Sequence, residues 1–296
     1  MLAKARGMIA DEVIIDLEDS VPADHKGQAR RTVLAALADG DWLAPTIAVR
    51  INGTGTRWCH RDVIELIEGG GERLASLIIP KVQSAADVEF VARLASMVER
   101  ESGRKSPVGL ELLIETATGL RCIHEAAHAS DRVESLILGY ADLAASLGRP
   151  IAVADDPGGI YWRWVLETVL VAARDAGIQA IDGPHFQIGD LDGLRARAKL
   201  ARTLGYDGKW ALHPTHVEPL NDVFSPTQEE FDRAAAILQE LERAATADGR
   251  GAVLLDGEMI DEASRKQATQ VLARGTAAGL SRTPTGFRGL RSDVSS

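Results

Sequence analysis

The stretches VGLELLIE at residues 108–115 and SLILGYAD at residues 135–142 decide the fold, because each is a short apolar run that closes on a carboxylate. Runs of this length are typical of strands buried on both faces. Residues 117–130, between them, have the pattern of a long helix. A strand, a helix and a strand in this order predict a βαβ unit of a parallel sheet. Glu115 and Asp142 then follow the ends of its two strands.

The same alternation of strands and helices runs along most of the chain. Further strands are predicted at residues 12–16, 46–51, 77–80, 178–181 and 209–212, and helices at residues 26–37, 62–68, 85–101, 161–176 and 190–204. This gives seven strands in all, whereas a TIM (β/α)₈ barrel has eight. A helix-like segment at residues 2–9 directly precedes the first visible strand, so the missing strand is expected upstream of Met1. The sequence therefore predicts a TIM barrel that lacks its first strand.

The pattern changes after the last predicted strand. An amphipathic helix is predicted at residues 227–247, a turn at 248–251, a short hairpin at 252–261 and a final helix at 262–278. The last residues are rich in Ser, Arg and Gly. We therefore expect a barrel domain at residues 1–224, a C-terminal helical extension at 225–280 and a flexible tail at 281–296.

Composition and charge exclude several classes of protein. The chain has 296 residues, of which 45% are hydrophobic and 26% charged, as in a globular protein with one large core. The net charge of −10 argues against a nucleic-acid partner or an anionic membrane surface. No apolar run is long enough to span a bilayer, the N-terminus lacks the apolar core of a signal peptide, and two cysteines give no disulfide framework. The cytoplasm is therefore the expected compartment.

Glu115 and Asp142 are the strongest candidates for chemistry. The carboxyl ends of parallel strands open into one crevice, so these two carboxylates are expected to converge there. Two hard oxygen ligands with little nearby to neutralise them predict a divalent cation, above all Mg²⁺.

Arg50, at the end of the second strand, predicts an anion contact, because its planar fork suits a carboxylate. Asn52 and Glu115 join it as candidate substrate ligands. Arg50 can also form a salt bridge to the acidic run that holds Asp16, Glu18 and Asp19, and the two interactions are compatible. The acidic run itself is either a solvated loop or a support for the metal, its waters or a lysine.

Lys81, at the end of the third strand, has two possible roles. It could form a Schiff base with a carbonyl substrate, or it could pair with Glu18 or Glu115. The ion pair is favoured, because a barrel that holds a metal does not also need an iminium. Two further strand-end groups, Asp182 and His213, are either site residues or turn residues.

These motifs, in order along the chain, resemble the citrate-lyase β-subunit-like family of CoA-ester lyases, which includes malyl-CoA lyases. The matching stretches are VIIDLEDSVP (13–22), VRING (49–53), IIPKV (78–82), LIETATGL (113–120), LGYADLAASLG (138–148), AIDGP (180–184) and GKWALHP (208–214). The resemblance runs from about residue 3 to residue 278. Family members usually begin with one strand more than is seen in this chain.

The resemblance implies a TIM barrel with a C-terminal lid and a Mg²⁺-dependent carbon–carbon lyase for malyl-, citramalyl- or citryl-CoA. Its products would be an acyl-CoA thioester and a 2-oxo acid. Glu115 and Asp142 would bind Mg²⁺, and Arg50 would hold the substrate carboxylate and oxyanion. Asp261, in the motif GEMIDE at 257–262, would reach the active site of a neighbouring subunit as acid and base. This implies a homo-oligomer, a trimer or a hexamer.

Two other functions remain open from the sequence. The first is a metal-dependent aldolase that acts on free hydroxy-keto acids and has no CoA pocket. The second is a catalytically silent family member that serves as a binding subunit. Substrate identity depends on the pocket walls, which the motifs do not specify.

Overall fold

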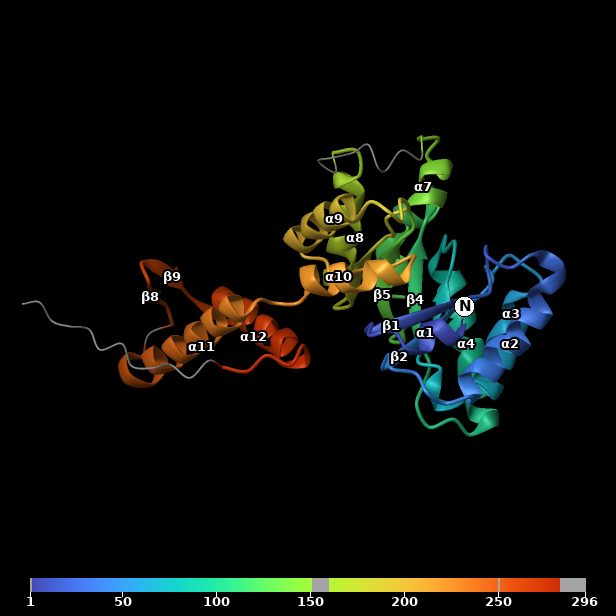
Figure 1. The fold of residues 1–296 in the computed structure, drawn as a ribbon, viewed down its shortest axis with the longest axis horizontal. Coiled ribbons are helices and arrows are strands. Elements are labelled where there is room, and N and C mark those ends of the chain that lie inside the picture. Colours follow the sequence, from blue (N-terminus) through green and yellow to red (C-terminus); the bar gives the residue numbers. More distant parts are fainter. Residues whose placement is uncertain (1, 151–159, 250, 283–296) are drawn as a thin grey trace, which may run out of the picture. The chain divides into compact units, whose positions relative to one another are not determined.

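A parallel sheet of seven strands lies at the centre of residues 1–224, and its strands are neighbours in sequence order (Figure 1). The strands are β1 (Glu12–Asp16), β2 (Thr46–Arg50), β3 (Ser76–Ile79), β4 (Gly109–Ile114), β5 (Val133–Leu138), β6 (Gln179–Asp182) and β7 (Gly208–Lys209). The structure is a computed structural model and describes residues 2–150, 160–249 and 251–282. Most of the tail expected at residues 281–296 lies outside the described residues.

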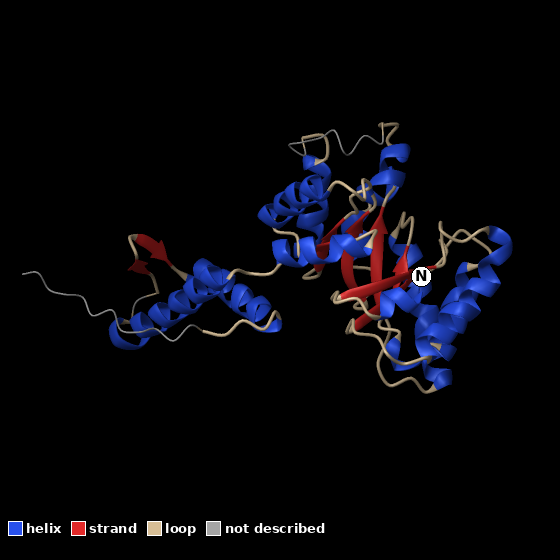
Figure 2. Cartoon of the chain, viewed as in Figure 1, coloured by secondary structure: helices blue, strands red, loops and turns tan. Residues whose placement is uncertain are grey.

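Helices connect the strands and flank the curled sheet, as parallel pairing requires (Figure 2). They are α1 (Leu2–Arg6), α2 (Lys26–Ala38), α3 (Cys59–Gly69), α4 (Ala85–Ser102), α5 (Ala117–Arg121), α6 (Ile123–Ala127), α7 (Tyr140–Ser146), α8 (Arg163–Asp175), α9 (Leu191–Leu204) and α10 (Val217–Phe224). In Figure 1, α2, α3 and α4 lie to the right of the sheet and α8 and α9 to its left, and residues of both groups pack in one cluster with the outward-facing strand residues. The α/β class expected from the alternating pattern is confirmed.

The main core lies between the sheet and its helices. Val49, Leu77 and Leu112 on the strands are completely buried and belong to one cluster with Val63 of α3 and Val91 of α4. Each side chain of this size that leaves water contributes roughly 1.5–3 kcal/mol. The apolar faces of the helices therefore hold the sheet in place.

The inward-facing positions of the strands form three layers, because successive side chains on a strand alternate between its two faces. The middle layer is an apolar cluster of Ala48, Ile78, Leu113 and Ile137, flanked by Ile14, Ile181 and Trp210. The layer at the amino ends is polar and includes Glu12, Thr46, Ser76, Glu111 and Ser135. The layer at the carboxyl ends contains Asp16, Arg50 and Glu115. The apolar layer thus separates two polar ends of the sheet.

Four elements differ clearly from the sequence prediction. The helix expected at residues 117–130 is two short helices, α5 and α6, because the backbone leaves the helical region at Cys122 (φ −98°, ψ 15°). The last strand is only Gly208–Lys209, and Leu212, expected within it, is 47% exposed. The short helices α7 and α10 were not predicted.

The described residues from Ser225 to Arg282 belong to a second compact unit. Its described elements are α11 (Gln228–Asp248), β8 (Val253–Leu255), β9 (Glu258–Ile260) and α12 (Glu262–Ala277). The hairpin turns at Asp256 and Gly257, which both have positive φ angles, as a tight turn between antiparallel strands requires. A Cβ atom at Gly275 of α12 would lie 2.2 Å from the Phe231 ring of α11, so glycine permits the close approach of these helices.

Within the described residues, no helix combines the length and apolar character needed to cross a membrane.

Candidate active site

The carboxyl end of the sheet brings together most of the residues that the sequence singled out. Asp16 and Arg50 end neighbouring strands and are register partners, and Glu115 directly follows β4. All three occupy inward-facing positions, two residues beyond the apolar layer. Glu18 and Lys81 reach the same mouth from the loops after β1 and β3. The strand-end rule therefore placed these side chains correctly.

Arg50 is held by two carboxylates. Its Nε and Nη2 atoms each lie 2.7 Å from an oxygen of Asp16, and Nη1 lies 3.2 Å from Glu18 Oε2. Burial alone would raise the pKa of Asp16, but the hydrogen bonds and charge of Arg50 outweigh it and lower that pKa to about 2. The guanidinium also lies 6.0 Å from the centre of the Trp210 ring. Asp16 therefore fixes the orientation of Arg50, a role more specific than the metal support that the sequence suggested.

Lys81 forms the ion pair that the sequence favoured. Its Nζ atom lies 2.5 Å from Glu18 Oε1 and 3.3 Å from Asp19 Oδ1. Its backbone N–H donates to Glu115 Oε1 at 2.8 Å. Lys81 adopts φ 52°, a left-handed conformation that costs a side chain with a Cβ atom about 1–2 kcal/mol. Backbone strain of this kind concentrates at functional sites, and here Lys81 contacts three acidic residues, Glu18, Asp19 and Glu115.

Glu115 is a buried carboxylate with excess negative charge around it. Only 2% of the surface of Glu115 is exposed. Burial raises its pKa to about 8, with help from the charges of Glu18 and Asp142, while the Lys81 N–H opposes the rise. A cation beside Glu115 would relieve this electrostatic penalty.

Gly139 makes room for the Glu115 side chain. A Cβ atom at Gly139 would lie 2.6 Å from Glu115 Cβ and 2.8 Å from Glu115 Oε2, both closer than real Cβ contacts. The glycine before α7 is therefore needed because another side chain occupies the space of its missing Cβ.

Replacing Gly139 by alanine is expected to displace the Glu115 carboxylate and weaken binding of a divalent cation by about tenfold. Overpacking of this kind also lowers the free energy of unfolding by about 1–3 kcal/mol. Isothermal titration with Mn²⁺ and thermal unfolding would measure the two effects. The control is Gly55→Ala, because no heavy atom lies within 4 Å of a Cβ at Gly55. Wild-type metal affinity in Gly139→Ala would contradict the prediction.

Asp142 lies in the first turn of α7, three residues past Gly139. Its charge acts on Glu115, so the two carboxylates share one electrostatic environment. Among residues 2–150, 160–249 and 251–282, no three His, Cys, Asp or Glu side chains form a group that could hold a metal. A cation at this mouth would therefore take two carboxylates and complete its shell with water and substrate oxygens. Mg²⁺ is commonly bound in this way, so the donor set fits it.

Asn52, which the sequence predicts as a substrate ligand, belongs to a buried hydrogen-bond network. The residue is 2% exposed, and both its backbone N–H and its side-chain NH₂ donate to Asp62 Oδ2, at 2.9 and 2.6 Å. Asp62 in turn accepts from Arg30 Nε at 2.8 Å. Asn52 therefore anchors the loop after Arg50 to α3 through its N–H groups, and the expected substrate contact stays a prediction.

Asp261 belongs to the second unit, where it is the N-cap of α12. The three hydrogen bonds that it accepts there, from the backbone N–H groups of Ala263 and Ser264 and from the Ser264 hydroxyl, all reach Oδ1. Sequence reasoning did not foresee this capping role, although Asp directly before a helix is a recognised signal.

The sequence singled out Asp182 but missed its two buried partners, Tyr140 and Lys209. Tyr140, the first residue of α7, donates from its hydroxyl to Asp182 Oδ1 at 2.6 Å, and Lys209 Nζ lies 2.5 Å from Asp182 Oδ2. Burial lowers the pKa of Lys209 and raises that of Tyr140. Asp182 and Lys209 both lie at strand ends, which was the only signal available.

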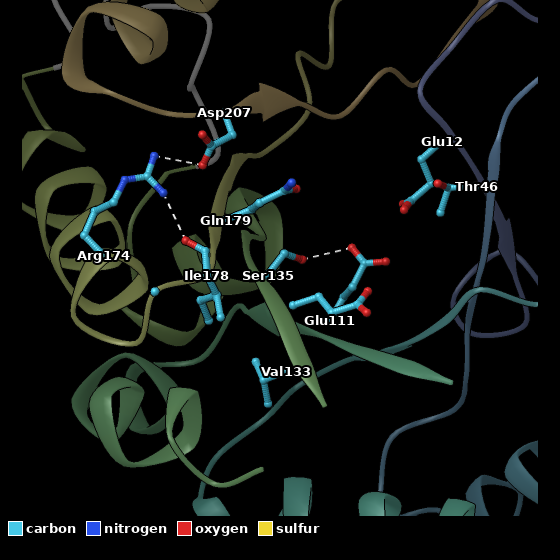
Figure 3. A pocket seen from close by; sticks show the side chains of 11 residues that line it. Glu12, Thr46, Glu111, Val133, Ser135, Arg174, Ile178, Gln179 and Asp207 are labelled. Atoms are coloured by element: carbon cyan, nitrogen blue, oxygen red, sulfur yellow. Dashed lines mark hydrogen bonds and ion pairs between the residues drawn. The ribbon is translucent and has the colours of Figure 1, made fainter. Parts of the chain in front are cut away.

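A hollow with a volume of about 580 Å³ lies at the amino ends of the strands (Figure 3). Its lining is Glu12, Thr46, Glu111, Val133, Glu134, Ser135, Arg174, Gly177, Ile178, Gln179 and Asp207. Glu111 accepts hydrogen bonds from Ser76 and Ser135, at 2.5 and 2.9 Å. Burial, followed by the charges of Glu111 and Glu134, raises the pKa of Glu12 to about 9.

This raised pKa makes the stability of the protein depend on pH. Glu12 has an ordinary pKa of 4.5 when unfolded and about 9 when folded, so the folded state binds the extra proton and loses stability as pH rises between these values. We expect Glu12→Gln to be more stable than the wild type at about pH 9, with a gap that shrinks toward about pH 5. Urea unfolding at several pH values would measure it. The exposed Glu68→Gln is the control, and a variant less stable than wild type at high pH would refute the prediction.

This geometry defines a class of protein: an α/β enzyme with an arginine guanidinium and two carboxylates at the ends of its strands. The family model of HpcH/HpaI aldolase/citrate lyase matches residues 1–214. The chain therefore belongs to this family of carbon–carbon lyases, as the motifs suggested.

Relatives and solved structures agree with this membership. An L-malyl-CoA/beta-methylmalyl-CoA lyase of Cereibacter sphaeroides is 39% identical over 285 residues, which cover 92% of this chain and 89% of that protein. A (3S)-malyl-CoA thioesterase of the same species is 35% identical over 93% of this chain and 90% of its own length. The crystal structure of protein CitE from Mycobacterium tuberculosis, in complex with magnesium, acetoacetate and coenzyme A, matches with a TM-score of 0.70 and 32% identity, over 90% of each chain.

Proposed function

We propose that this protein is a Mg²⁺-dependent lyase that cleaves a β-hydroxyacyl-CoA of the malyl-CoA type to a shorter acyl-CoA thioester and a 2-oxo acid, or forms it in reverse. The observation that carries the proposal is the clamped Arg50 in the same mouth as the buried carboxylate of Glu115. The relative named as a malyl-CoA lyase and the neighbour crystallised with magnesium and coenzyme A support it.

The reaction produces two fragments, a 2-oxo acid and a thioester enolate, and each must be stabilised separately. The β-hydroxyl loses its proton, its carbon becomes the carbonyl of the 2-oxo acid, and the electron pair of the broken C–C bond passes to the thioester as an enolate. Glu115 and Asp142 would hold the Mg²⁺, which when bound polarises the oxygens of the 2-oxo acid fragment. Arg50, kept in one orientation by Asp16, would bind the carboxylate of that fragment and offset its developing charge.

The enolate needs a proton, and Asp261 is the proposed carrier. Its capping bonds reach only Oδ1 among the described residues, so Oδ2 is not committed to the cap. We propose that residues 225–280 act as a lid and that Asp261 serves the site of a neighbouring subunit in a trimer or hexamer. Residues 1–224 would then be a TIM-type barrel that includes the seven strands described above.

The test of the reaction is an assay of malyl-, methylmalyl-, citramalyl- and citryl-CoA with Mg²⁺, which follows the 2-oxo acid and the free CoA thiol separately. A lyase releases the 2-oxo acid without free thiol, and EDTA abolishes the release. Release of free thiol would instead indicate a thioesterase, the activity named for one relative. Cleavage of free hydroxy-keto acids alone would indicate an aldolase. No turnover of any of these compounds would refute the proposed function.

The shared site has its own test. Asp261→Asn keeps an N-cap but cannot carry the proton, so we expect a loss of activity of about 10²–10⁴-fold with α12 intact. Mixing Asp261→Asn subunits with Arg50→Ala subunits is expected to restore part of the activity, because some sites then combine two intact parts. Circular dichroism checks the helix. Mixed oligomers with no recovered activity would count against a proton carrier from a neighbouring subunit.

A further inference from the structure

The ends of β5, β6 and β7 are joined by the buried triad Tyr140, Asp182 and Lys209. Lys209 Nζ lies 2.5 Å from Asp182 Oδ2, and the two side chains are 1% and 3% exposed. The Tyr140 hydroxyl donates to Asp182 Oδ1 at 2.6 Å, and Lys209 Nζ lies 5.8 Å from the centre of the Tyr140 ring. Every polar atom of the triad therefore has a partner inside the protein.

Stability alone is a weak explanation for this triad. A buried ion pair loses so much hydration that apolar replacements of similar size are often neutral or stabilising. What a satisfied buried network supplies is a fixed geometry. Two further bonds strengthen that constraint: the Gly183 N–H donates to Asp182 Oδ1 at 2.8 Å, and Lys209 Nζ donates to the Gly183 carbonyl at 2.5 Å.

The element that this geometry fixes is the start of α7. Tyr140 is the first residue of α7, and Asp142 lies in the same turn. The Tyr140 ring packs edge-on against Trp162, with centroids 5.1 Å apart, and a Cβ at Gly183 would lie 2.6 Å from it. The helix is only seven residues long, and Gly139 offers no side-chain cap. Leu143 and Ala144 of the same helix are also buried in the core, and Tyr140 is the side chain of its first turn that ties the helix to the strands β6 and β7.

We propose that Tyr140, Asp182 and Lys209 are positioning residues that hold Asp142 in the geometry for metal binding. The inference rests on the proposed metal-dependent function and assigns the triad a role in the affinity of that site. None of the three residues needs to touch the metal. The tyrosine hydroxyl transmits the constraint from the strands β6 and β7 to the helix that carries Asp142.

The test compares Tyr140→Phe with Tyr206→Phe. Each variant removes one buried hydroxyl bond, since the Tyr206 hydroxyl donates to the Leu166 carbonyl at 2.8 Å, in a residue that is completely buried. Titration with Mn²⁺, followed by calorimetry, is expected to show about tenfold weaker binding in Tyr140→Phe and unchanged binding in Tyr206→Phe. Thermal unfolding is expected to fall similarly in both. The kcat of Tyr140→Phe is expected to recover at saturating metal.

Three results would overturn the proposal, and they have different meanings. Unchanged Mn²⁺ affinity in Tyr140→Phe would show that the hydroxyl does not position Asp142. Equal weakening in both variants would assign the effect to general loss of stability. If the wild type bound no Mn²⁺, or if Glu115→Gln bound it equally well, the metal-dependent function itself would fail, and the inference with it.

Discussion

Glu115→Gln is expected to bind Mg²⁺ at least a hundredfold more weakly and to lose about 10³-fold in the rate of C–C cleavage. Glutamine keeps the shape of the side chain and an oxygen that can accept from the Lys81 N–H. It removes only the negative charge, which is what a Mg²⁺ ligand at this position supplies. The measurement is a Mn²⁺ titration together with steady-state kinetics on the thioester that the wild type cleaves.

The same substitution should not unfold the protein. Since burial raises the pKa of Glu115 to about 8, its charged form is disfavoured in the metal-free fold. Folded-state stability is lost as pH rises from the ordinary pKa of 4.5 toward that value, so the neutral variant is expected to unfold at an equal or higher temperature than the metal-free wild type. Full metal-dependent activity in a folded Glu115→Gln would eliminate Glu115 as a metal ligand.

The matched control for this experiment is Glu111→Gln. Glu111 is also a buried glutamate, lies on the same strand, and is held by Ser76 and Ser135 at the opposite end of the sheet. We expect its variant to change stability and to leave metal affinity unchanged. If both variants lost metal binding, the effect would belong to the strand as a whole and not to the mouth.

Arg50→Lys is expected to lower kcat/KM by about 10²–10³-fold. The guanidinium satisfies both oxygens of Asp16 and still reaches Glu18 with Nη1. One ammonium group cannot reproduce this arrangement, so the variant would lose both the fixed orientation and the planar fork that suits a substrate carboxylate. Kinetics with the 2-oxo acid in the condensation direction would measure the loss.

Arg132→Lys controls for the loss of a paired arginine. Arg132 makes a two-point contact with Glu99, at 2.8 Å between Nη1 and Oε1, and it is 17% exposed, close to the 15% of Arg50. It lies near the start of β5, away from the mouth. Both variants are expected to lose similar stability, whereas only Arg50→Lys is expected to lose activity. Near wild-type turnover in Arg50→Lys would show that any cation suffices at this position.

Part of the site was predictable because it follows a local rule. Glu115, Asp142, Arg50 and Lys81 were found as polar residues directly after apolar runs, since parallel strands open at their carboxyl ends. The alternation of strand and helix likewise predicted the parallel order of the sheet. Each of these patterns is formed by residues that lie within a few positions of one another. A single sequence is therefore enough to detect them.

The choice of partners was not predictable from such patterns. Asn52 lies two residues beyond the strand end at Arg50, yet its amide donates to Asp62, ten residues further along the chain. The sequence treated Asp16 as one of several acidic neighbours, whereas the strand register places it directly beside Arg50. The hydrogen bonds that Tyr140 and Lys209 donate to Asp182 span 42 and 27 positions of the sequence.

The sequence by itself thus determined the α/β class, the family and the carboxylates at the mouth, because the residues at strand ends belong to short, recognisable sequence motifs. Only the tertiary structure decided which carboxylate clamps Arg50, why Gly139 must lack a side chain, and how a buried triad reaches the helix of Asp142. The physical reason is that hydrogen bonding and steric fit depend on distances set by packing, and packing joins residues that are remote in sequence.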